Sequence, residues 1–257
     1  MTTPTPALFD LTGKRAVVTG GTRGIGMMIA RGLLDAGASV VISSRKQEAV
    51  DAAVAELQPH GDVTGIAADL SRESEAVRLA EAVGGPLHVL VNNAGATWGE
   101  PIETFPESAW DKLVAINLKG PFFLTRAFLP ALKQAASLDD PARVINIGSI
   151  DGIHVPVLPT YAYSSTKAAV HQLTRHLAKE LSPQGITVNA VAPGPFESKM
   201  MAATLEAFGD DIAAAAPLRR IGRPDDMAGV AVFLASRAGS YITGAVIPVD
   251  GGIATTR

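Results

Sequence analysis

Short runs rich in valine and isoleucine recur along the whole chain, separated by longer stretches with helical periodicity. In one such stretch Val170, Leu173, Leu177 and Leu181 repeat at intervals of three and four residues, as one face of a helix requires. Seven of the apolar runs are predicted to be strands: 15–19, 39–43, 63–67, 87–91, 143–147, 187–192 and 245–249. Strands that alternate with helices in this way predict an α/β fold, in which helices cover both faces of a parallel sheet.

Chain length and one irregular segment indicate the domain organisation. The 257 residues suit one large α/β domain, and no linker or repeat divides them, so we expect a single domain over residues 1–257. The segment from Pro193 to Arg223 breaks the alternation with several prolines and an alanine run. Long irregular insertions in compact domains are usually functional, and we expect a partly helical lid at about residues 195–220.

Composition excludes several classes of function. The absence of cysteine rules out disulfides, thiolate catalysis and sulfur-ligated metals. The net charge of -3 argues against a nucleic-acid partner, and the five histidines lack the carboxylate pairing of a metal site. Met1 to Asp10 show no signal peptide, and no apolar run reaches the ~20 residues of a membrane helix. We therefore expect a cytoplasmic metabolic protein without a metal, a membrane or a nucleic-acid partner.

A glycine-rich segment, residues 19–26 with the sequence TGGTRGIG, follows the first predicted strand and leads into a helical pattern. Glycines allow backbone amides at a helix N-terminus to approach a pyrophosphate closely. The spacing is G-x-x-x-G-x-G, not the commoner G-x-G-x-x-G, and a plain structural turn is the alternative, because turns also need glycine. The strand–loop–helix context favours a dinucleotide site.

The end of the second predicted strand indicates which dinucleotide binds. NAD-specific folds usually place an acidic residue there, on the ribose 2′-hydroxyl. This chain has Ser43, Ser44 and Arg45 instead, with Arg23 as a second cation in the glycine loop. Guanidinium groups suit bidentate phosphate recognition, which predicts NADP(H). The alternative is that Arg45 is only a solvated residue at the start of a helix.

Tyr163 and Lys167 stand four residues apart in a predicted helix and therefore share one face. A free tyrosine has a pKa near ~10, and a nearby cation lowers that value by stabilising the phenolate. The pair alone is common by chance. It gains meaning from Ser149 at the end of the fifth predicted strand, the segment 92–95 (NNAG) after the fourth, and Asn117 in the helix beyond.

Together with Asp69 after the third strand, these motifs resemble the short-chain dehydrogenase/reductase family over Gly13 to about Gly252. The similarity is greatest to bacterial NADPH-dependent 3-ketoacyl reductases, among them those associated with rhamnolipid synthesis. It implies a Rossmann-type, doubly wound, seven-stranded parallel sheet and a homotetramer. It also implies an enzyme that reduces a ketone to a secondary alcohol with NADPH, the expected substrate being a 3-ketoacyl thioester or related ketoester.

The family's catalytic roles carry over to four residues. Ser149 would hydrogen-bond the substrate carbonyl, and Tyr163 would give its proton to the developing alkoxide. Lys167 would bind the nicotinamide ribose and lower the pKa of Tyr163, while Asn117 would hold a water that links Lys167 to solvent. The resemblance further implies a set of cofactor-binding residues: Gly20, Thr22, Arg23, Gly24, Ile25, Gly26, Ser44, Arg45, Asp69, Leu70, Asn93, Ala94, Gly95, Tyr163, Lys167, Pro193, Gly194, Phe196 and Ser198.

Individual cofactor contacts follow from the same resemblance. Asp69 would meet the adenine amine, and Asn93 and Gly95 would line the channel for the adenosine and ribose. The backbone of residues 193–196, with Ser198, would orient the nicotinamide carboxamide.

The substrate stays open at this level. Carrier-protein reductases typically carry basic residues just before the fifth and sixth strands, but Asp140 and Gln184 occupy those positions here, which disfavours acyl carrier protein. An acyl chain would contact Phe196, Met200 and Met201 in the lid. The alternatives are NADP-dependent oxidation of a sugar acid, steroid or other secondary alcohol, and a non-catalytic NADP(H)-binding regulator on the same fold.

Overall fold

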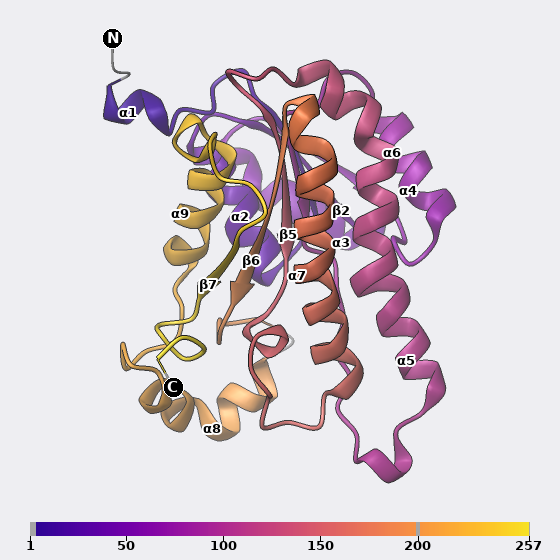
Figure 1. Cartoon of the computed structure of the whole chain (residues 1–257), viewed down its shortest axis with the longest axis vertical. Coiled ribbons are helices and arrows are strands. Elements are labelled where there is room, and N and C mark those ends of the chain that lie inside the picture. The colour runs from indigo at the N-terminus through magenta and orange to yellow at the C-terminus, as the bar shows by residue number, and fades with distance from the viewer. Residues whose placement is uncertain (1–3, 199–200, 257) are drawn as a thin grey trace.

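The computed structural model describes residues 4–198 and 201–256 (Figure 1). Its centre is a seven-stranded sheet in the order β3-β2-β1-β4-β5-β6-β7, in which all neighbouring strands are parallel. The strands are β1 Arg15–Thr19, β2 Ser39–Ser44, β3 Val63–Ala67, β4 Val89–Asn92, β5 Ala142–Ile147, β6 Ile186–Pro193 and β7 Val246–Val249. The doubly wound fold expected from the sequence is confirmed.

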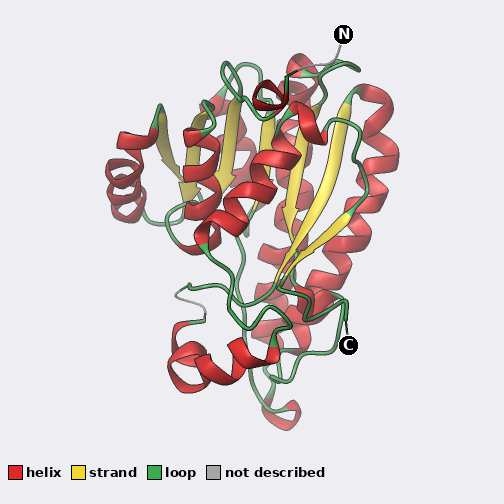
Figure 2. Ribbon diagram, turned by 90° about the vertical axis from the view of Figure 1, so that its left-hand side faces the viewer, coloured by secondary structure: helices red, strands yellow, loops and turns green. Residues whose placement is uncertain are grey.

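Helices cover both faces of this sheet (Figures 1 and 2). The α-helices are α1 Thr5–Leu8, α2 Gly24–Asp35, α3 Gln47–Leu57, α4 Glu73–Val83, α5 Glu107–Leu113, α6 Gly120–Ala135, α7 Tyr161–Leu181, α8 Ala202–Ala215 and α9 Pro224–Ala235. The π-helical segment η3 Val114–Lys119 joins α5 to α6. The single 3-10 turns are η1 Gln58–His60, η2 Ile102–Thr104, η4 Ile150–Gly152, η5 Ser182–Gln184 and η6 Arg237–Gly239. Within the described ranges, no helix has the length and apolar character needed to cross a membrane.

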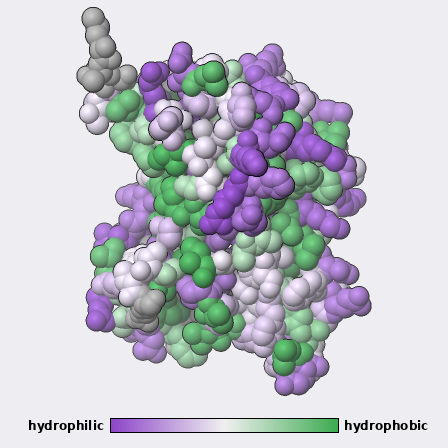
Figure 3. Space-filling model, viewed as in Figure 1, coloured by the Kyte–Doolittle hydropathy of each residue, from purple (hydrophilic) through white to green (hydrophobic). Residues whose placement is uncertain are grey.

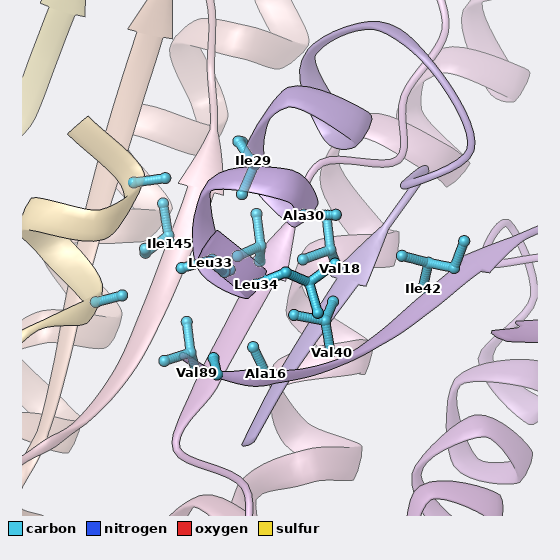
Figure 4. Close-up of a cluster of buried hydrophobic side chains, with 14 of the residues drawn as sticks. Ala16, Val18, Ile29, Ala30, Leu33, Leu34, Val40, Ile42, Val89 and Ile145 are labelled. Atoms are coloured by element: carbon cyan, nitrogen blue, oxygen red, sulfur yellow. The ribbon is translucent and has the colours of Figure 1, made fainter. Parts of the chain in front are cut away.

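Two hydrophobic clusters, one on each face of the sheet, explain why the strand sequences are continuous apolar runs. Successive residues of a strand point to opposite faces, and both faces of a covered parallel sheet are buried. Val18 packs with Ile29 and Leu33 of α2 in the first cluster, which also includes residues of α3 and α9 (Figure 4). Its neighbour Val17 packs with Phe128 of α6 in the second cluster, together with residues of α4 and α7. The middle of the strand is therefore apolar at consecutive positions.

The predicted strand boundaries agree with the structure to within two residues. The largest difference is at β4, which was expected to start at Leu87 and starts at Val89. The amide of Leu87 donates to the carbonyl oxygen of Ala131 in α6 at 3.0 Å and so does not join the sheet. The expected lid contains α8, which is kinked at Phe208.

The loops that carry the predicted site gather at the carboxyl ends of the strands. In Figures 1 and 2 these ends point downward, and α8 lies below them. In a doubly wound sheet this edge is where ligands bind.

Candidate active site

The glycine loop is tied to the end of β4 by two polar side chains. The Thr19 hydroxyl accepts from the amides of Asn93 and Ala94 at 3.0 and 3.1 Å. The Asn93 side-chain amide donates to the carbonyl oxygens of Thr19 and Gly20 at 2.8 and 3.2 Å. Gly20 has φ +64°, and a Cβ on Gly26 would lie 2.3 Å from the Gly20 oxygen. Only glycine fits this close approach, and the Asn93 side chain holds the loop.

The N-terminus of α2 is open toward this loop. Arg23 is its N-cap residue, no side chain caps it, and its first turn holds no acidic residue. Arg23 and Arg45 are both exposed, and neither side chain makes a hydrogen bond or ion pair with any described residue. A helix N-terminus flanked by two free guanidinium groups is suited to bind phosphate.

Asp69 lies beside the same region, half-buried after β3. Its carboxylate accepts from the Ser71 hydroxyl at 2.8 Å and faces the Arg72 guanidinium at 3.8 Å. These contacts fix the carboxylate at the carboxyl edge, where an adenine amine is expected.

Asn117, Gly95 and Lys167 converge between η3, β4 and α7. A Cβ on Gly95 would lie 3.1 Å from Asn117 Oδ1 and 3.7 Å from Lys167 Nζ. Asn117 is buried; its Oδ1 accepts from the Ala96 amide at 2.9 Å, and its Nδ2 donates to Ala96 O and to the Thr166 hydroxyl at 3.0 and 3.1 Å. The side-chain amide is therefore committed to the protein, and the expected water would need another group of Asn117, such as its backbone carbonyl.

Tyr163 and Lys167 lie on one face of α7, as predicted, with Lys167 Nζ 5.6 Å from the centre of the Tyr163 ring. The predicted lowering of the Tyr163 pKa by Lys167 is wrong in this structure. Burial raises the pKa of Tyr163 to about 12, a hydrogen bond with Ser149 opposes this, and the charge of Asp151 adds to it. Lys167 instead donates to the carbonyl oxygen of Ile147 at 2.7 Å, and burial lowers its own pKa to about 8.

Ser149 caps the short turn η4. Its Oγ accepts from the amide of Asp151 at 3.1 Å, and the residue is only 7% exposed. With the link to Tyr163, this places the serine hydroxyl next to the phenol, at the carboxyl end of β5. Asp151 is partly buried there, and burial raises the pKa of its carboxyl, against a smaller opposite effect of His154.

The segment after β6 returns to the glycine loop. A Cβ on Gly24 would lie 3.1 Å from Ser198 Cβ, so residues far apart in sequence meet at the start of α2. Gly194 is held to β7, with its amide donating to Val249 O at 2.9 Å.

The predicted contact of Phe196 with an acyl chain is wrong. Its side chain is 2% exposed and packs in the first hydrophobic cluster, against Gly222. Met200 lies outside the described residues, and Met201 is half-buried.

Three residues near the site were not predicted. Thr19 and Thr166 act through hydrogen bonds to partners on other elements, for which the sequence carries no signal. His171 is buried one turn beyond Lys167. The spacing of four residues from Lys167, together with glycines on both sides of Ser149, is the signal that could have indicated it.

The comparisons with known proteins agree with this geometry. The family model described as enoyl-(acyl carrier protein) reductase matches residues 20–254. The chain is 49% identical over 250 residues to the rhamnolipids biosynthesis 3-oxoacyl-[acyl-carrier-protein] reductase of Pseudomonas aeruginosa, covering 95% of this chain and 97% of the relative. The protein belongs to the short-chain dehydrogenase/reductase family. It is an oxidoreductase, as the resemblance implied.

Solved structures of other short-chain dehydrogenases/reductases superpose closely on it. The Pseudomonas aeruginosa RhlG/NADP active-site complex has a TM-score of 0.93 at 47% identity, covering 96% of this chain and 99% of that one. A gluconate 5-dehydrogenase of Burkholderia cenocepacia in complex with NADP and tartrate has a TM-score of 0.90 at 32% identity, covering 99% and 100%. The similarity thus includes both a ketoacyl reductase and a sugar-acid dehydrogenase.

Proposed function

We propose that this protein is an NADPH-dependent reductase of a 3-oxoacyl thioester or related ketoester. The observation that carries the proposal is the joint placement of Ser149, Tyr163 and Lys167, where a protonated phenol stands between a serine hydroxyl and a buried ammonium. The runner-up is oxidation of a sugar acid, which the likeness to gluconate 5-dehydrogenase supports.

NADPH fits the residues at the carboxyl edge. A Cβ at Gly20 or Gly26 would collide with the Asn93 side chain or the Gly20 carbonyl oxygen, so glycine keeps the tight loop at the start of α2, and the side chains of Arg23 and Arg45 are free to meet a 2′-phosphate. When bound, NADPH supplies the hydride. Two relatives whose structures were solved with NADP share this fold, which favours the same cofactor here.

The protein's own groups would handle the proton. Ser149 Oγ lies beside Tyr163 and would donate a hydrogen bond to the substrate carbonyl, and the Tyr163 hydroxyl would protonate the alkoxide. A pKa of about 12 keeps the phenol protonated at neutral pH, which suits a proton donor better than a proton acceptor. Lys167, with its pKa near 8 and its Nζ 5.6 Å from the ring centre, would return the proton.

The surroundings of Tyr163 favour a neutral, apolar substrate. The loop between η4 and α7, residues 153–160, contains no Asp, Glu, Lys or Arg, and Val155 and Val157 are 89% and 102% exposed. Figure 3 shows hydrophobic residues on the lower half of this face, near α8. The negative charge of Asp151 near Tyr163 would repel the carboxylate of a sugar acid.

A substrate comparison tests the proposal. We expect kcat/KM for NADPH oxidation with a 3-oxoacyl-CoA or a simple 3-ketoester to exceed that with a 5-keto sugar acid at least tenfold. Faster turnover of the sugar acid would support the runner-up. A protein that binds NADPH without reducing any ketone would be a regulator.

Carrier-protein delivery is disfavoured by the charges at the predicted docking positions. Asp140 pairs with Lys14 and with Arg143, and Arg220 pairs with Asp226 at 2.5 Å, so little free positive charge is left for an acidic carrier. We expect the CoA ester to be reduced at least as efficiently as the same acyl group on carrier protein. A carrier advantage that high salt and Arg219→Glu both remove would contradict this.

We further infer that residues 1–257 form one domain, with α8 as part of a lid at about 195–220, and that the protein assembles as a homotetramer. The edge strand β7 supports a subunit contact, because all four of its residues are half-buried without a neighbour on their outer side. Light scattering of the purified protein tests the assembly, and a monomeric mass would contradict it.

A further inference from the structure

His171 occupies a closed site directly behind the catalytic groups. It lies in α7, four residues after Lys167 and eight after Tyr163, so the three side chains share one side of the helix. Its side chain is only 4% exposed. No step of the proposed reaction uses this buried titratable group.

Two glycines on either side of Ser149 form the walls of that site. A Cβ on Gly148 would lie 2.1 Å from His171 Nε2, and a Cβ on Gly152 would lie 2.9 Å from His171 Cε1. Gly152 also meets the backbone of α7, where its Cβ would be 2.7 Å from the Lys167 carbonyl carbon. The imidazole therefore fills the space between α7 and the segment 148–152 that presents Ser149.

The hydrogen bonds of the imidazole connect it to this segment. The Gly152 backbone carbonyl accepts a hydrogen bond from the ring. Nε2 has no hydrogen-bond partner among the described residues, which assigns the donating N–H to Nδ1. Burial and the nearby Lys167 charge lower the pKa of His171 to about 4, so the ring is neutral at pH 7 and holds one donor and one acceptor.

We infer that His171 is a positioning residue for Ser149: its imidazole fills the hole left by Gly148 and Gly152 and holds the segment 148–152 on α7 through the Gly152 carbonyl. This inference rests on the role proposed for Ser149. An aliphatic side chain would fill the hole without the hydrogen bond. An error in the position of a catalytic group of about 1 Å reduces the rate by up to ~100-fold.

The test compares His171→Leu and His171→Asn with the wild type. The Asn side chain can place a donor near the position of Nδ1, whereas Leu cannot. We expect His171→Leu to lower kcat about tenfold with KM and the Kd for NADPH changed less than twofold, and His171→Asn to recover most of the loss. His176→Leu, at an exposed position of the same helix, is the matched control and should leave kcat unchanged.

A double-mutant cycle separates positioning from general destabilisation. If His171 acts through Ser149, His171→Leu should slow the Ser149→Ala variant far less than it slows the wild type. An equal loss in both backgrounds, or a folded His171→Leu protein with wild-type kcat, would overturn the inference. If His171→Leu does not fold, the tautomer of His171 in the wild type, measured by NMR as below, decides.

The rates are read with whichever ketone the wild type reduces fastest, so a wrong substrate does not affect the outcome. If the wild type reduces no ketone, the proposed function is wrong, and a second measurement is needed to test the placement of His171. Long-range ¹H–¹⁵N NMR should then find a neutral Nδ1–H tautomer of His171 at pH 7. A charged ring or the Nε2–H tautomer would overturn the inference.

Discussion

At the amino edge of the sheet, arginine side chains bind the carbonyl ends of helices, whereas at the carboxyl edge the side chains of Arg23 and Arg45 have no partner among the described residues. Arg15 donates to the carbonyl oxygens of Val83 and Gly84 at the end of α4, at 2.6 and 2.5 Å. Arg143, 2% exposed, donates to Ser236 O at the end of α9 and pairs with Asp140. Such contacts satisfy carbonyl groups and complement the helix dipole.

The helix N-termini at the carboxyl edge differ in the charged residues of their first turns. α9 begins with Asp225 and Asp226 in its first turn, and α4 begins with Glu73 and Glu75. All three helices have an arginine N-cap, but α2 alone of the three has no acidic residue in its first turn. The protein thus supplies acidic counter-charges at the N-termini of α4 and α9 and omits them at the proposed phosphate site.

The largest expected effect is a loss of activity when the proton donor at the carboxyl edge is removed. Tyr163→Phe keeps the ring and removes the hydroxyl, so kcat should fall at least ~1000-fold while the Kd for NADPH changes less than twofold. Tyr161→Phe is the control, since Tyr161 is 40% exposed and its ring packs against Phe105 at 5.8 Å. Similar kcat values for the two variants would exclude Tyr163 as the general acid.

Next in size is the cofactor preference. The wild type should prefer NADPH over NADH at least tenfold in kcat/KM, because a charge-assisted phosphate contact contributes about 1.5–3 kcal/mol. Ser44→Asp/Arg45→Ala should abolish that preference without lowering the melting temperature, since Arg45 has no partner to lose among the described residues. A wild-type preference for NADH would refute the assignment of the phosphate site.

At the amino edge the same kind of change should affect stability and not activity. Asp140→Asn leaves the buried guanidinium of Arg143 without its counter-charge, at an expected loss of about 2 kcal/mol in the free energy of unfolding. Glu73→Gln removes an exposed pair with Arg126 and should change stability by less than about 0.5 kcal/mol. Thermal melts and kcat of both variants check this; a lowered kcat in Asp140→Asn would contradict the separation of the two edges.

The last expected effect is on the pH dependence of stability and concerns Lys167, the buried cation of the carboxyl edge. Its pKa of about 8 lies below the ordinary 10.5, so between these values the unfolded chain holds a proton that the folded protein has released. Wild-type stability should therefore rise from pH 8 to 10.5. Lys167→Met should abolish activity, raise the free energy of unfolding at pH 7 by about 1 kcal/mol and flatten the rise. Lys179→Met, at an exposed position of the same helix, should change neither the activity nor the free energy of unfolding nor its pH dependence. A Lys167→Met protein that is less stable than the wild type would show that burial of the Lys167 charge does not destabilise the fold.

The sequence by itself determined the fold and the order of the site along the chain. Successive strand residues point to opposite faces, and where both are apolar, as Val17 and Val18 are, both can be buried only in a sheet that is covered on both faces. This pattern placed the strands to within two residues. The spacing of Tyr163 and Lys167 equals about one helical turn and put both on one face of α7 before any coordinates. These are local, periodic properties.

Properties that depend on contacts between distant segments were decided only by the tertiary structure. The Tyr163 pKa follows from burial and from neighbours on η4, and not from the lysine one turn away. Phe196 turns into the core because Gly222 makes room for its ring, and His171 becomes part of the site because Gly148 and Gly152 do. Desolvation and close packing act between residues that the sequence does not place together, and a pattern along the chain holds no record of them.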